Sequence, residues 1–237
     1  MITRLHRIQE RIAIAARLSG REPDAVTLVA VSKTWPVETL IAAIEAGALH
    51  LGENRVQEAE EKIAQLGARF PHVHWHLIGH LQRNKAKIAA PRFHLIHSLD
   101  SLRLAETLDR YVMHTAPLPV LLQVNVSGEA SKAGFDLPGG IENQAGFECF
   151  LLEVAAILAL PKLHVQGLMT IAPFADDPEA ARPAFRMLRL LRDELQQHFP
   201  QADWRHLSMG MSDDFEVAIE EGSTLVRVGR AIFSDRE

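Results

Sequence analysis

The chain has 237 residues, of which 47% are hydrophobic and 23% charged, so it has enough apolar residues for a large folded core. Its formal net charge of −5 gives no electrostatic basis for binding nucleic acid or an acidic membrane. No apolar stretch is long enough to span a bilayer, and the single cysteine, Cys149, excludes an intramolecular disulfide framework. We therefore expect a cytoplasmic globular protein in which Cys149 is a packed apolar side chain rather than a nucleophile.

The first predicted element is an N-terminal helix over residues 4–18. Although this segment carries four arginines, Glu10 interrupts the positive charge, which argues against a targeting sequence. The apolar residues of the segment recur at helical spacing: Leu5, Ile8, Ile12, Ala15 and Ala16. We therefore expect an ordinary amphipathic helix that precedes the first strand.

Eight short apolar runs predict eight strands along the rest of the chain. In order, they cover residues 28–33, 49–54, 74–79, 93–99, 120–125, 164–172, 204–210 and 225–229. Helical patterns lie between them, near residues 37–46, 55–67, 82–90, 101–114, 143–159, 178–198 and 213–221. The longer irregular segment, 127–140, is rich in glycine and follows the fifth strand, where we expect a loop.

The regular alternation of strands and helices is typical of βαβ units and of an α/β protein with a parallel sheet. Eight such units predict a single-domain (β/α)₈ TIM barrel over residues 1–237, for which roughly 250 residues is the usual length. A doubly wound open sheet is the alternative. However, the glycine-rich turn that opens the dinucleotide site of that fold does not follow the first strand.

A lysine, Lys33, ends the first predicted strand, directly before Thr34 and Trp35. A buried parallel strand delivers its last side chain to the carboxyl end of a barrel, where ligands bind. A partly desolvated lysine at that place can lose its proton and attack a carbonyl group. Most lysines are solvated surface charges, so Lys33 alone does not decide between these two interpretations.

The last two predicted strands are followed by small residues that permit close approach of the backbone to a ligand. Gly210 and Gly229 stand after the seventh and eighth strands, the position at which TIM barrels bind phosphate. Both glycines could instead serve only tight turns. Their joint presence favours an anion held by the Ser208–Gly210 backbone together with Gly229 and Arg230.

Two acidic residues set a limit on where that anion can lie. Ser212 is predicted to be a helix N-cap, with Asp213 and Asp214 in the first turn. Carboxylates in a first turn would repel a phosphate placed on the axis of that helix. We therefore expect both acids to be turned outward, away from the anion.

A strand-end lysine, a phosphate site and a strand-borne arginine together point to pyridoxal 5′-phosphate (PLP). Lys33 would form the Schiff base, and the loops after the last two strands would hold the phosphate. Arg227, inside the last strand, would face the pyridine nitrogen if its side chain points into the mouth of the barrel. Because an arginine does not readily give up its proton, that nitrogen would stay unprotonated, which weakens PLP as an electron sink.

Several motifs of this chain resemble those of the pyridoxal phosphate homeostasis proteins, whose fold is similar to the N-terminal barrel domain of alanine racemase. The motifs lie at residues 29–34, 52–58, 75–82, 84–85, 123–125, 129, 132–135, 167–169, 207–212, 214 and 227–229. The resemblance covers nearly the whole chain, and Trp35 and Arg83 stand at positions that we expect to vary.

This resemblance implies that Lys33 is the Schiff-base lysine, that Asn54 lies beside the cofactor ring and that Arg227 faces the ring nitrogen. It also implies a group of residues around the phosphate: Ser208, Gly210, Gly229 and Arg230. Proteins of this family are regarded as binders and carriers of PLP that maintain its supply and the amino-acid balance. We therefore expect a non-catalytic, monomeric PLP carrier, with PLP-requiring apo-enzymes as possible recipients.

A PLP-dependent racemase of low activity is the first alternative. Racemisation needs a base on each face of the carbanion, and in alanine racemase a tyrosine from a further domain is the second base. The sequence continues for only eight residues after Gly229, so we expect no such domain, and its one tyrosine, Tyr111, falls in a predicted helix. His80, or the histidines at 72–76, could serve only as weak proton shuttles.

A metal-dependent hydrolase is the second alternative, and an interaction module with an empty barrel is the third. His72, His74 and His76 alternate, and barrel metal hydrolases use such histidines together with an acidic ligand from another strand. No aspartate ends the eighth strand, so structural or surface histidines are the better interpretation, and we expect no metal. The combination of Lys33 with a two-loop phosphate site argues against an empty barrel.

Overall fold

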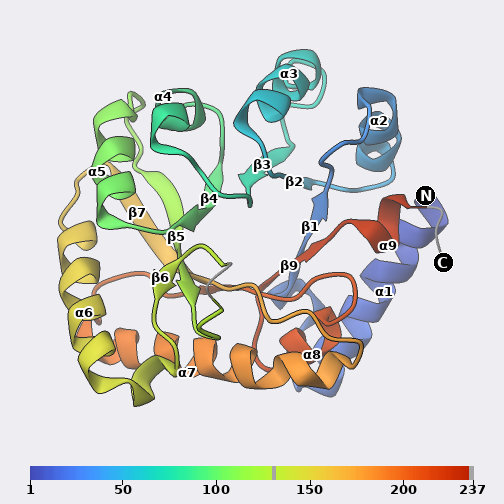
Figure 1. The fold of residues 1–237 in the computed structure, drawn as a ribbon. Coiled ribbons are helices and arrows are strands. Elements are labelled where there is room, and N and C mark those ends of the chain that lie inside the picture. The colour runs from blue at the N-terminus through green and yellow to red at the C-terminus, as the bar shows by residue number, and fades with distance from the viewer. Residues whose placement is uncertain (130–131, 235–237) are drawn as a thin grey trace.

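The computed structural model describes residues 1–129 and 132–234, and its centre is a closed barrel of parallel strands (Figure 1). The strands of the ring are β1 (Thr27–Val31), β2 (His50–Glu53), β3 (His74–Leu77), β4 (Leu95–Leu99), β5 (Leu118–Asn125), β7 (Leu163–Met169), β8 (His206–Ser208) and β9 (Leu225–Val228). Pairing of β1 with β9 and of β4 with β5 closes the ring. The predicted TIM barrel is therefore confirmed, and the open sheet is wrong.

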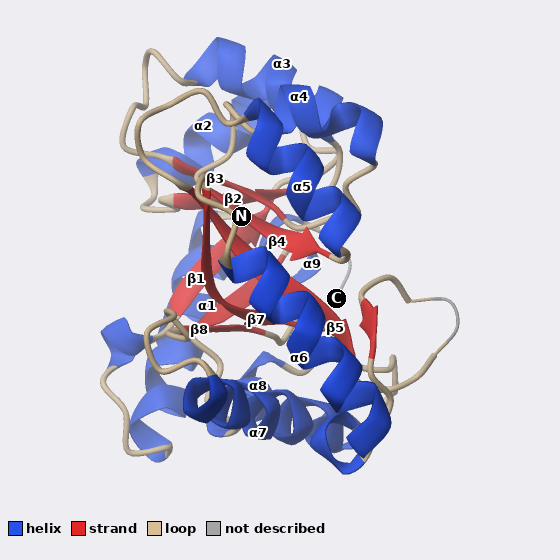
Figure 2. Cartoon of the chain, turned by 90° about the vertical axis from the view of Figure 1, so that its left-hand side faces the viewer, coloured by secondary structure: helices blue, strands red, loops and turns tan. Residues whose placement is uncertain are grey.

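Helices lie around the outside of this ring, as Figures 1 and 2 show. They are α1 (Ile2–Leu18), α2 (Val37–Glu45), α3 (Val56–Leu66), α4 (Ala86–Ala89), α5 (Leu102–Tyr111), α6 (Gln144–Leu158), α7 (Arg182–His198), α8 (Phe215–Glu220) and α9 (Arg230–Phe233). The predicted N-terminal helix is confirmed as α1, which packs on α8 and α9 and buries all five residues of its apolar stripe. None of the described helices has the length and apolar character needed to cross a membrane.

The interior of the barrel has an apolar layer with a polar layer next to it. The apolar layer packs together as one cluster: Val29, Leu95, Leu121, Met169 and Leu225. Residues two positions apart on a strand share a face, so the residues that follow these on β4, β5 and β9 also point inward. Those residues are His97, Gln123 and Arg227, all of them buried. The polar layer thus lies towards the carboxyl ends of the strands.

The segments around α7 and α8 differ from the predicted elements. Helix α8 begins at Phe215, and Asp214 precedes it with its Oδ1 accepting the backbone N–H of Met211 at 2.6 Å. Ser212 is therefore not the N-cap, which corrects that prediction. The predicted helix over 178–198 starts as a 3₁₀ turn at Pro178–Ala181 before α7, and α9 has no predicted counterpart.

The predicted loop at 127–140 contains a two-residue strand, β6 (Phe135–Asp136), which pairs in parallel with β5 outside the ring. Gly134 permits this pairing, because its φ is +131° and a Cβ there would lie 2.9 Å from the backbone nitrogen of Asn125. Residues 130–131 of the segment lie outside the described residues.

Helix α6 corrects the expectation for Cys149, which is exposed. The buried face of α6 consists of residues at helical spacing: Phe147, Phe150, Val154 and Ile157. Cys149 lies about 160° around the helix from Phe147, so it points to the solvent. The prediction of a packed thiol is wrong because residues that are neighbours in the sequence of a helix point in different directions, so apolar neighbours do not imply burial.

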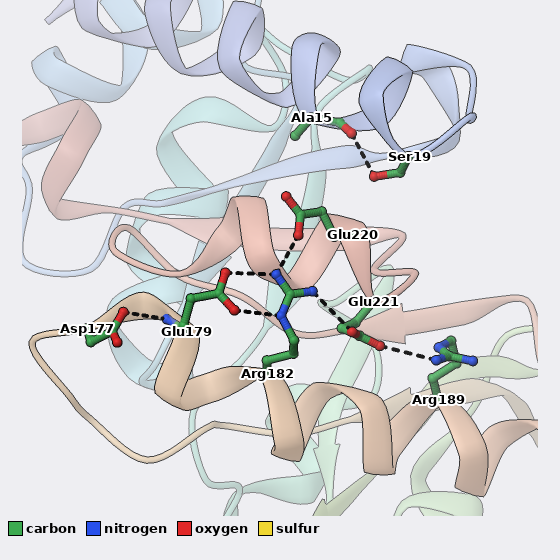
Figure 3. A network of polar contacts seen from close by, with 8 residues as sticks. All are labelled: Ala15, Ser19, Asp177, Glu179, Arg182, Arg189, Glu220 and Glu221. Atoms are coloured by element: carbon green, nitrogen blue, oxygen red, sulfur yellow. Dashed lines mark hydrogen bonds and ion pairs between the residues drawn. The ribbon is translucent and has the colours of Figure 1, made fainter.

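A network of ion pairs ties α7 to α8 on the outside of the barrel (Figure 3). Arg182 donates from Nε to Glu179 at 2.6 Å, from Nη2 to Glu220 at 2.5 Å and from Nη1 to Glu221 at 3.1 Å. Arg189 donates to the second oxygen of Glu221 at 3.2 Å. The network holds α8 against α7, and α8 is the helix that follows the loop after β8.

Candidate functional site

A cavity of about 390 Å³ opens where the strands of the barrel end at their carboxyl termini. Five of the predicted site residues line it: Lys33, Asn54, Arg227, Gly229 and Arg230. They follow or belong to β1, β2 and β9, which are neighbours in the ring. Parallel strands place their last residues on one face of the barrel, and this is why residues far apart in sequence share one cavity.

The remaining lining residues were not predicted as site residues. An apolar wall comes from Val31, Ile78, Ile171 and Phe174, and the loop after β8 adds Met211, Ser212 and Asp213. Phe174 is 81% exposed at the rim. Ser212 was missed because it was taken for a helix cap; its place two residues after Gly210, in the loop that follows β8, was the available signal.

Lys33 is exposed at the mouth of the cavity, two residues after β1 ends. The next residue, Thr34, has a φ of +66°, which is uncommon for a residue with a side chain. Its backbone N–H donates to Glu58 Oε1 at 2.6 Å, and Lys62 Nζ donates to the carbonyl of Ser32 at 2.8 Å. These bonds fix the turn on both sides of Lys33 and so define where its amine emerges.

A buried ion pair lies behind this turn. Lys62 Nζ contacts Glu53 Oε1 at 2.8 Å and Glu58 Oε1 at 2.6 Å, and the Ser32 hydroxyl donates to Glu53 Oε1 at 2.6 Å. Burial raises the pKa of Glu53, whereas the hydrogen bonds from Lys62 and Ser32 oppose that shift. Sequence reasoning missed Lys62, although its spacing of four residues from Glu58 on one helix face predicts an ion pair.

Arg227 points from β9 into the barrel and is only 4% exposed. Its Nη1 donates to the Ser208 hydroxyl at 2.6 Å, and its Nη2 donates to the carbonyl of Thr170 at 2.8 Å. Burial lowers the pKa of Arg227 to about 10, against the opposing charge of Asp214. The guanidinium therefore stays charged at neutral pH and acts only as a hydrogen-bond donor to the cavity.

Two predicted site residues, Ser208 and Gly210, do not line the cavity. Ser208 is fully buried between Arg227 and His97. Gly210 has a φ of +92°, and a Cβ there would lie 2.6 Å from the Cβ of Ala218. Its role is to let the chain turn closely under α8, and its carbonyl accepts the backbone N–H of Arg227 at 3.0 Å.

The polar groups suited to an anion lie next to these residues. Ser212 lines the cavity, and its hydroxyl accepts the backbone N–H of Ala231 at 3.3 Å, which joins the loop after β8 to the loop after β9. Arg230 lines the same place and is paired with Asp213. The carboxylate of Asp213 is thus engaged by an arginine, and its side chain is exposed at the rim of the cavity.

The histidines at 72–76 do not form a common site. His72 is exposed and precedes β3, His74 stacks on His50 with ring centroids 4.9 Å apart, and His76 is buried in the barrel. Within residues 1–129 and 132–234, no group of three or more His, Cys, Asp or Glu side chains could hold a metal ion. The geometry therefore gives the metal-hydrolase alternative no site.

The donor set of the cavity fits a phosphorylated aldehyde with an aromatic ring. It offers a primary amine on Lys33, a buried cationic donor on Arg227, and a hydroxyl and a second cation on Ser212 and Arg230. The apolar wall, which includes Ile171, suits the faces of a planar ring. An amine of this kind can join to an aldehyde with loss of water.

Comparison with known proteins agrees with this geometry. The sequence matches the family described as "Alanine racemase, N-terminal domain" over residues 3–237. A pyridoxal phosphate homeostasis protein of Aquifex aeolicus is 44% identical over 235 residues, covering 99% of this chain and 97% of that protein. The protein of the same name from Vibrio cholerae is 42% identical over 98% of this chain and 95% of that protein.

Solved structures extend the comparison to three dimensions. PipY of Synechococcus elongatus, solved with PLP bound, is 39% identical with a TM-score of 0.79, over 96% of this chain and 100% of that chain. Alanine racemase of Corynebacterium glutamicum has a TM-score of 0.70 at 16% identity, over 97% of this chain and 61% of that chain, which shows the shared fold alone. This chain belongs to the pyridoxal phosphate homeostasis proteins, within the family of the alanine racemase N-terminal domain.

Proposed function

We propose that this protein binds PLP in the cavity and acts as an intracellular carrier of the cofactor, without a dedicated catalytic reaction. The observation that carries the proposal is that Lys33 and Arg227 line one cavity. The amine of Lys33 is the group that joins to the aldehyde of PLP as a Schiff base. When bound, PLP supplies an electron-withdrawing ring to the amine joined to it.

The other residues orient the cofactor. Arg227 donates a hydrogen bond to the ring nitrogen and keeps its own proton, and Asn54 lies beside the ring. The phosphate is held by Ser212, Gly229 and Arg230, which line the cavity. Ser208 and Gly210 support this arrangement from behind: Ser208 holds Arg227, and Gly210 shapes the loop that carries Ser212.

A carrier is favoured over an amino-acid racemase because the described residues that line the cavity offer no unpaired base besides Lys33. Apart from Lys33, the titratable side chains among the described lining residues are Asp213, Arg227 and Arg230, and Asp213 is paired with Arg230. Tyr111 lies on α5, outside the barrel ring. The relatives that carry the homeostasis name support the same choice.

A carrier of PLP also acts on other proteins, to which it passes the cofactor. As a monomer whose cavity opens at one face of the barrel, the protein can release PLP to PLP-requiring apo-enzymes. Changes in the amino-acid balance then follow from changes in the PLP supply of those enzymes.

The binding part is tested by borohydride reduction of the protein after addition of PLP, followed by peptide mass mapping. The proposal expects a visible absorption band that reduction removes, and a pyridoxyl group on Lys33. A pyridoxyl group on another lysine instead, such as Lys132, would refute the assignment of Lys33.

The carrier part is tested with the loaded protein in two assays. In the first, an apo-enzyme that requires PLP is mixed with the loaded protein, and we expect it to regain activity. In the second, L-alanine is incubated with the loaded protein in deuterium oxide, and we expect no enzymatic formation of D-alanine. Sustained turnover to D-alanine would favour the racemase alternative.

A further inference from the structure

A continuous line of polar side chains crosses the interior of the barrel and ends at Arg227. His50 Nδ1 lies 2.9 Å from His76 Nε2, and His76 Nδ1 lies 2.8 Å from His97 Nε2. His97 Nδ1 lies 2.8 Å from the Ser208 hydroxyl, which accepts from Arg227 Nη1 at 2.6 Å. We call these five residues the histidine chain.

The chain is assembled from strands that meet only in the closed barrel. His50 belongs to β2, His76 to β3, His97 to β4, Ser208 to β8 and Arg227 to β9. The last four of these residues are each 4% exposed or less, and His50 is half-buried. Barrel interiors are ordinarily filled by branched apolar side chains, and a polar network in their place is tolerated only when its members are satisfied.

Arginine fixes the direction of every hydrogen bond in the chain. A guanidinium only donates, so the oxygen of Ser208 accepts from Arg227 and its single proton is available for His97 Nδ1. His97 then carries its proton on Nε2 and donates to His76 Nδ1, and His76 likewise donates from Nε2 to His50 Nδ1.

The opposite direction leaves a buried proton without a partner. If His97 donated from Nδ1 to Ser208, the hydroxyl proton of Ser208 would have no remaining acceptor among its contacts in the described residues. In the direction set by Arg227, each proton has an acceptor as far as His50, which is half-buried and has access to water. Burial also lowers the pKa of His76 and His97 well below the ordinary value, so that both stay neutral.

We propose that His97, which is hydrogen-bonded in turn to His76 and through it to His50, is a positioning residue for Arg227. Because the hydroxyl of Ser208 donates its proton to His97, its oxygen accepts from the guanidinium, and this holds Arg227 in the orientation in which it donates into the cavity. The carbonyl of Thr170 anchors Nη2, and Ser208 anchors Nη1. His97 does not touch the ligand. This inference rests on the proposed function, since the group that Arg227 addresses is the ring nitrogen of PLP.

The direction of the chain is tested first, on the protein without added PLP. Nitrogen NMR of histidine-labelled protein at neutral pH reports which ring nitrogen of each histidine carries a proton. We expect His50, His76 and His97 to be neutral and protonated on Nε2. A proton on Nδ1 of His76 or His97, or a charged ring at either residue, would overturn the proposal.

The positioning role is tested with a pair of matched variants at one position. In His97→Asn, the amide oxygen replaces Nδ1 and still accepts from Ser208, whereas His97→Leu removes that acceptor. For His97→Leu, we expect PLP affinity to fall by about tenfold, with a shifted absorption band of bound PLP. The reason is that the Ser208 hydroxyl loses the acceptor of its proton and no longer holds the guanidinium of Arg227 in place. For His97→Asn, we expect the wild-type band and an affinity close to that of the wild type.

The outcomes separate this inference from the proposed function. A wild-type band and affinity in His97→Leu, or equal impairment of both variants, would overturn the positioning role. If His97→Leu does not fold, the NMR result still decides the direction of the chain. A wild-type protein that leaves Lys33 unmodified after PLP addition and reduction refutes the proposed function instead, and this is seen before any variant is compared.

Discussion

The wall of the cavity and the three rings of the histidine chain are both polar, but they differ in charge. At the carboxyl end, Lys33 and Arg227 line the cavity, and the buried pair of Lys62 and Glu53 supports the turn beside it. The rings of His50, His76 and His97 cross the barrel towards Arg227, and burial lowers the pKa of each of them. Charge is thus concentrated at the cavity, and the three neutral rings continue the hydrogen bonding into the barrel without charge.

The largest expected effect follows from removing the amine of Lys33 from the cavity. Lys33→Ala abolishes the covalent PLP adduct completely, because no other residue that lines the cavity in the described part of the chain carries a primary amine. Lys33 is exposed, so the melting temperature stays close to that of the wild type. Absorption spectra before and after reduction measure the adduct. Lys87→Ala, an exposed lysine on α4, is the control and keeps the adduct.

A large loss of stability is expected from breaking the buried pair. Lys62→Met leaves Glu53 buried without its cation and lowers the free energy of unfolding by about 3 kcal/mol. Urea denaturation measures this loss. The double variant Glu53→Gln with Lys62→Met recovers part of it, since no charge is then left unpaired. An unchanged denaturation midpoint in Lys62→Met contradicts the structural role of the pair.

The neutral histidine rings in the barrel predict how the free energy of unfolding depends on pH. Burial lowers the pKa of His76 and His97 in the folded state below that of the unfolded chain, so protons bind the unfolded chain more tightly. Stability is therefore fully present above the unfolded pKa, about 6.5, and is lost as the pH falls, by up to about 1.4 kcal/mol per pH unit for each histidine. His50, whose pKa burial lowers to about 4, adds its own loss of stability between about pH 6.5 and that pH.

Urea denaturation at a series of pH values from 7 to 4 checks this dependence. His97→Asn is expected to flatten the slope, because one buried titrating ring is removed. His72→Asn, which replaces an exposed histidine, keeps the wild-type slope. A wild-type stability that is flat over this range would show that the buried rings do not stay neutral.

The smallest expected effect concerns Arg227, which joins the cavity to the histidine rings. Arg227→Gln keeps a donor but loses the charge, and we expect PLP affinity to fall by about tenfold with a shifted absorption band. Fluorescence titration with PLP measures the affinity. Arg230→Gln serves as the comparison, because Arg230 is exposed and paired with Asp213, and its loss is expected to shift the band less. Equal spectra for Arg227→Gln and the wild type would argue against a contact between Arg227 and the ring.

Much of the fold and part of the site followed from local sequence patterns. Alternating strand and helix patterns determine the barrel, and strand-end positions brought Lys33, Asn54 and Arg227 to one cavity. Local patterns also gave a wrong helix start in the loop after β8, where a serine and an aspartate both have the side chains that favour the position before a helix. Ser212 and two following acids are typical of a helix start, but α8 begins at Phe215 and Asp214 binds the backbone of Met211 instead.

The histidine chain could not be predicted because its members come from five strands. His76 was considered only with its neighbours in sequence, His72 and His74, whereas its hydrogen-bond partners are His50 and His97. Which residues meet across the barrel depends on the register of the strands and on closure of the ring. Single-strand patterns carry neither, and the same reason explains why Ser208 was assigned to the ligand rather than to Arg227.

A crystal structure of the wild-type protein with PLP tests the central claim most directly. The account predicts PLP joined to Lys33 Nζ, with its ring nitrogen within hydrogen-bond distance of the Arg227 guanidinium and its phosphate at Ser212 and Gly229. A ring nitrogen that faces away from Arg227, or PLP joined at a lysine outside this cavity, would contradict it.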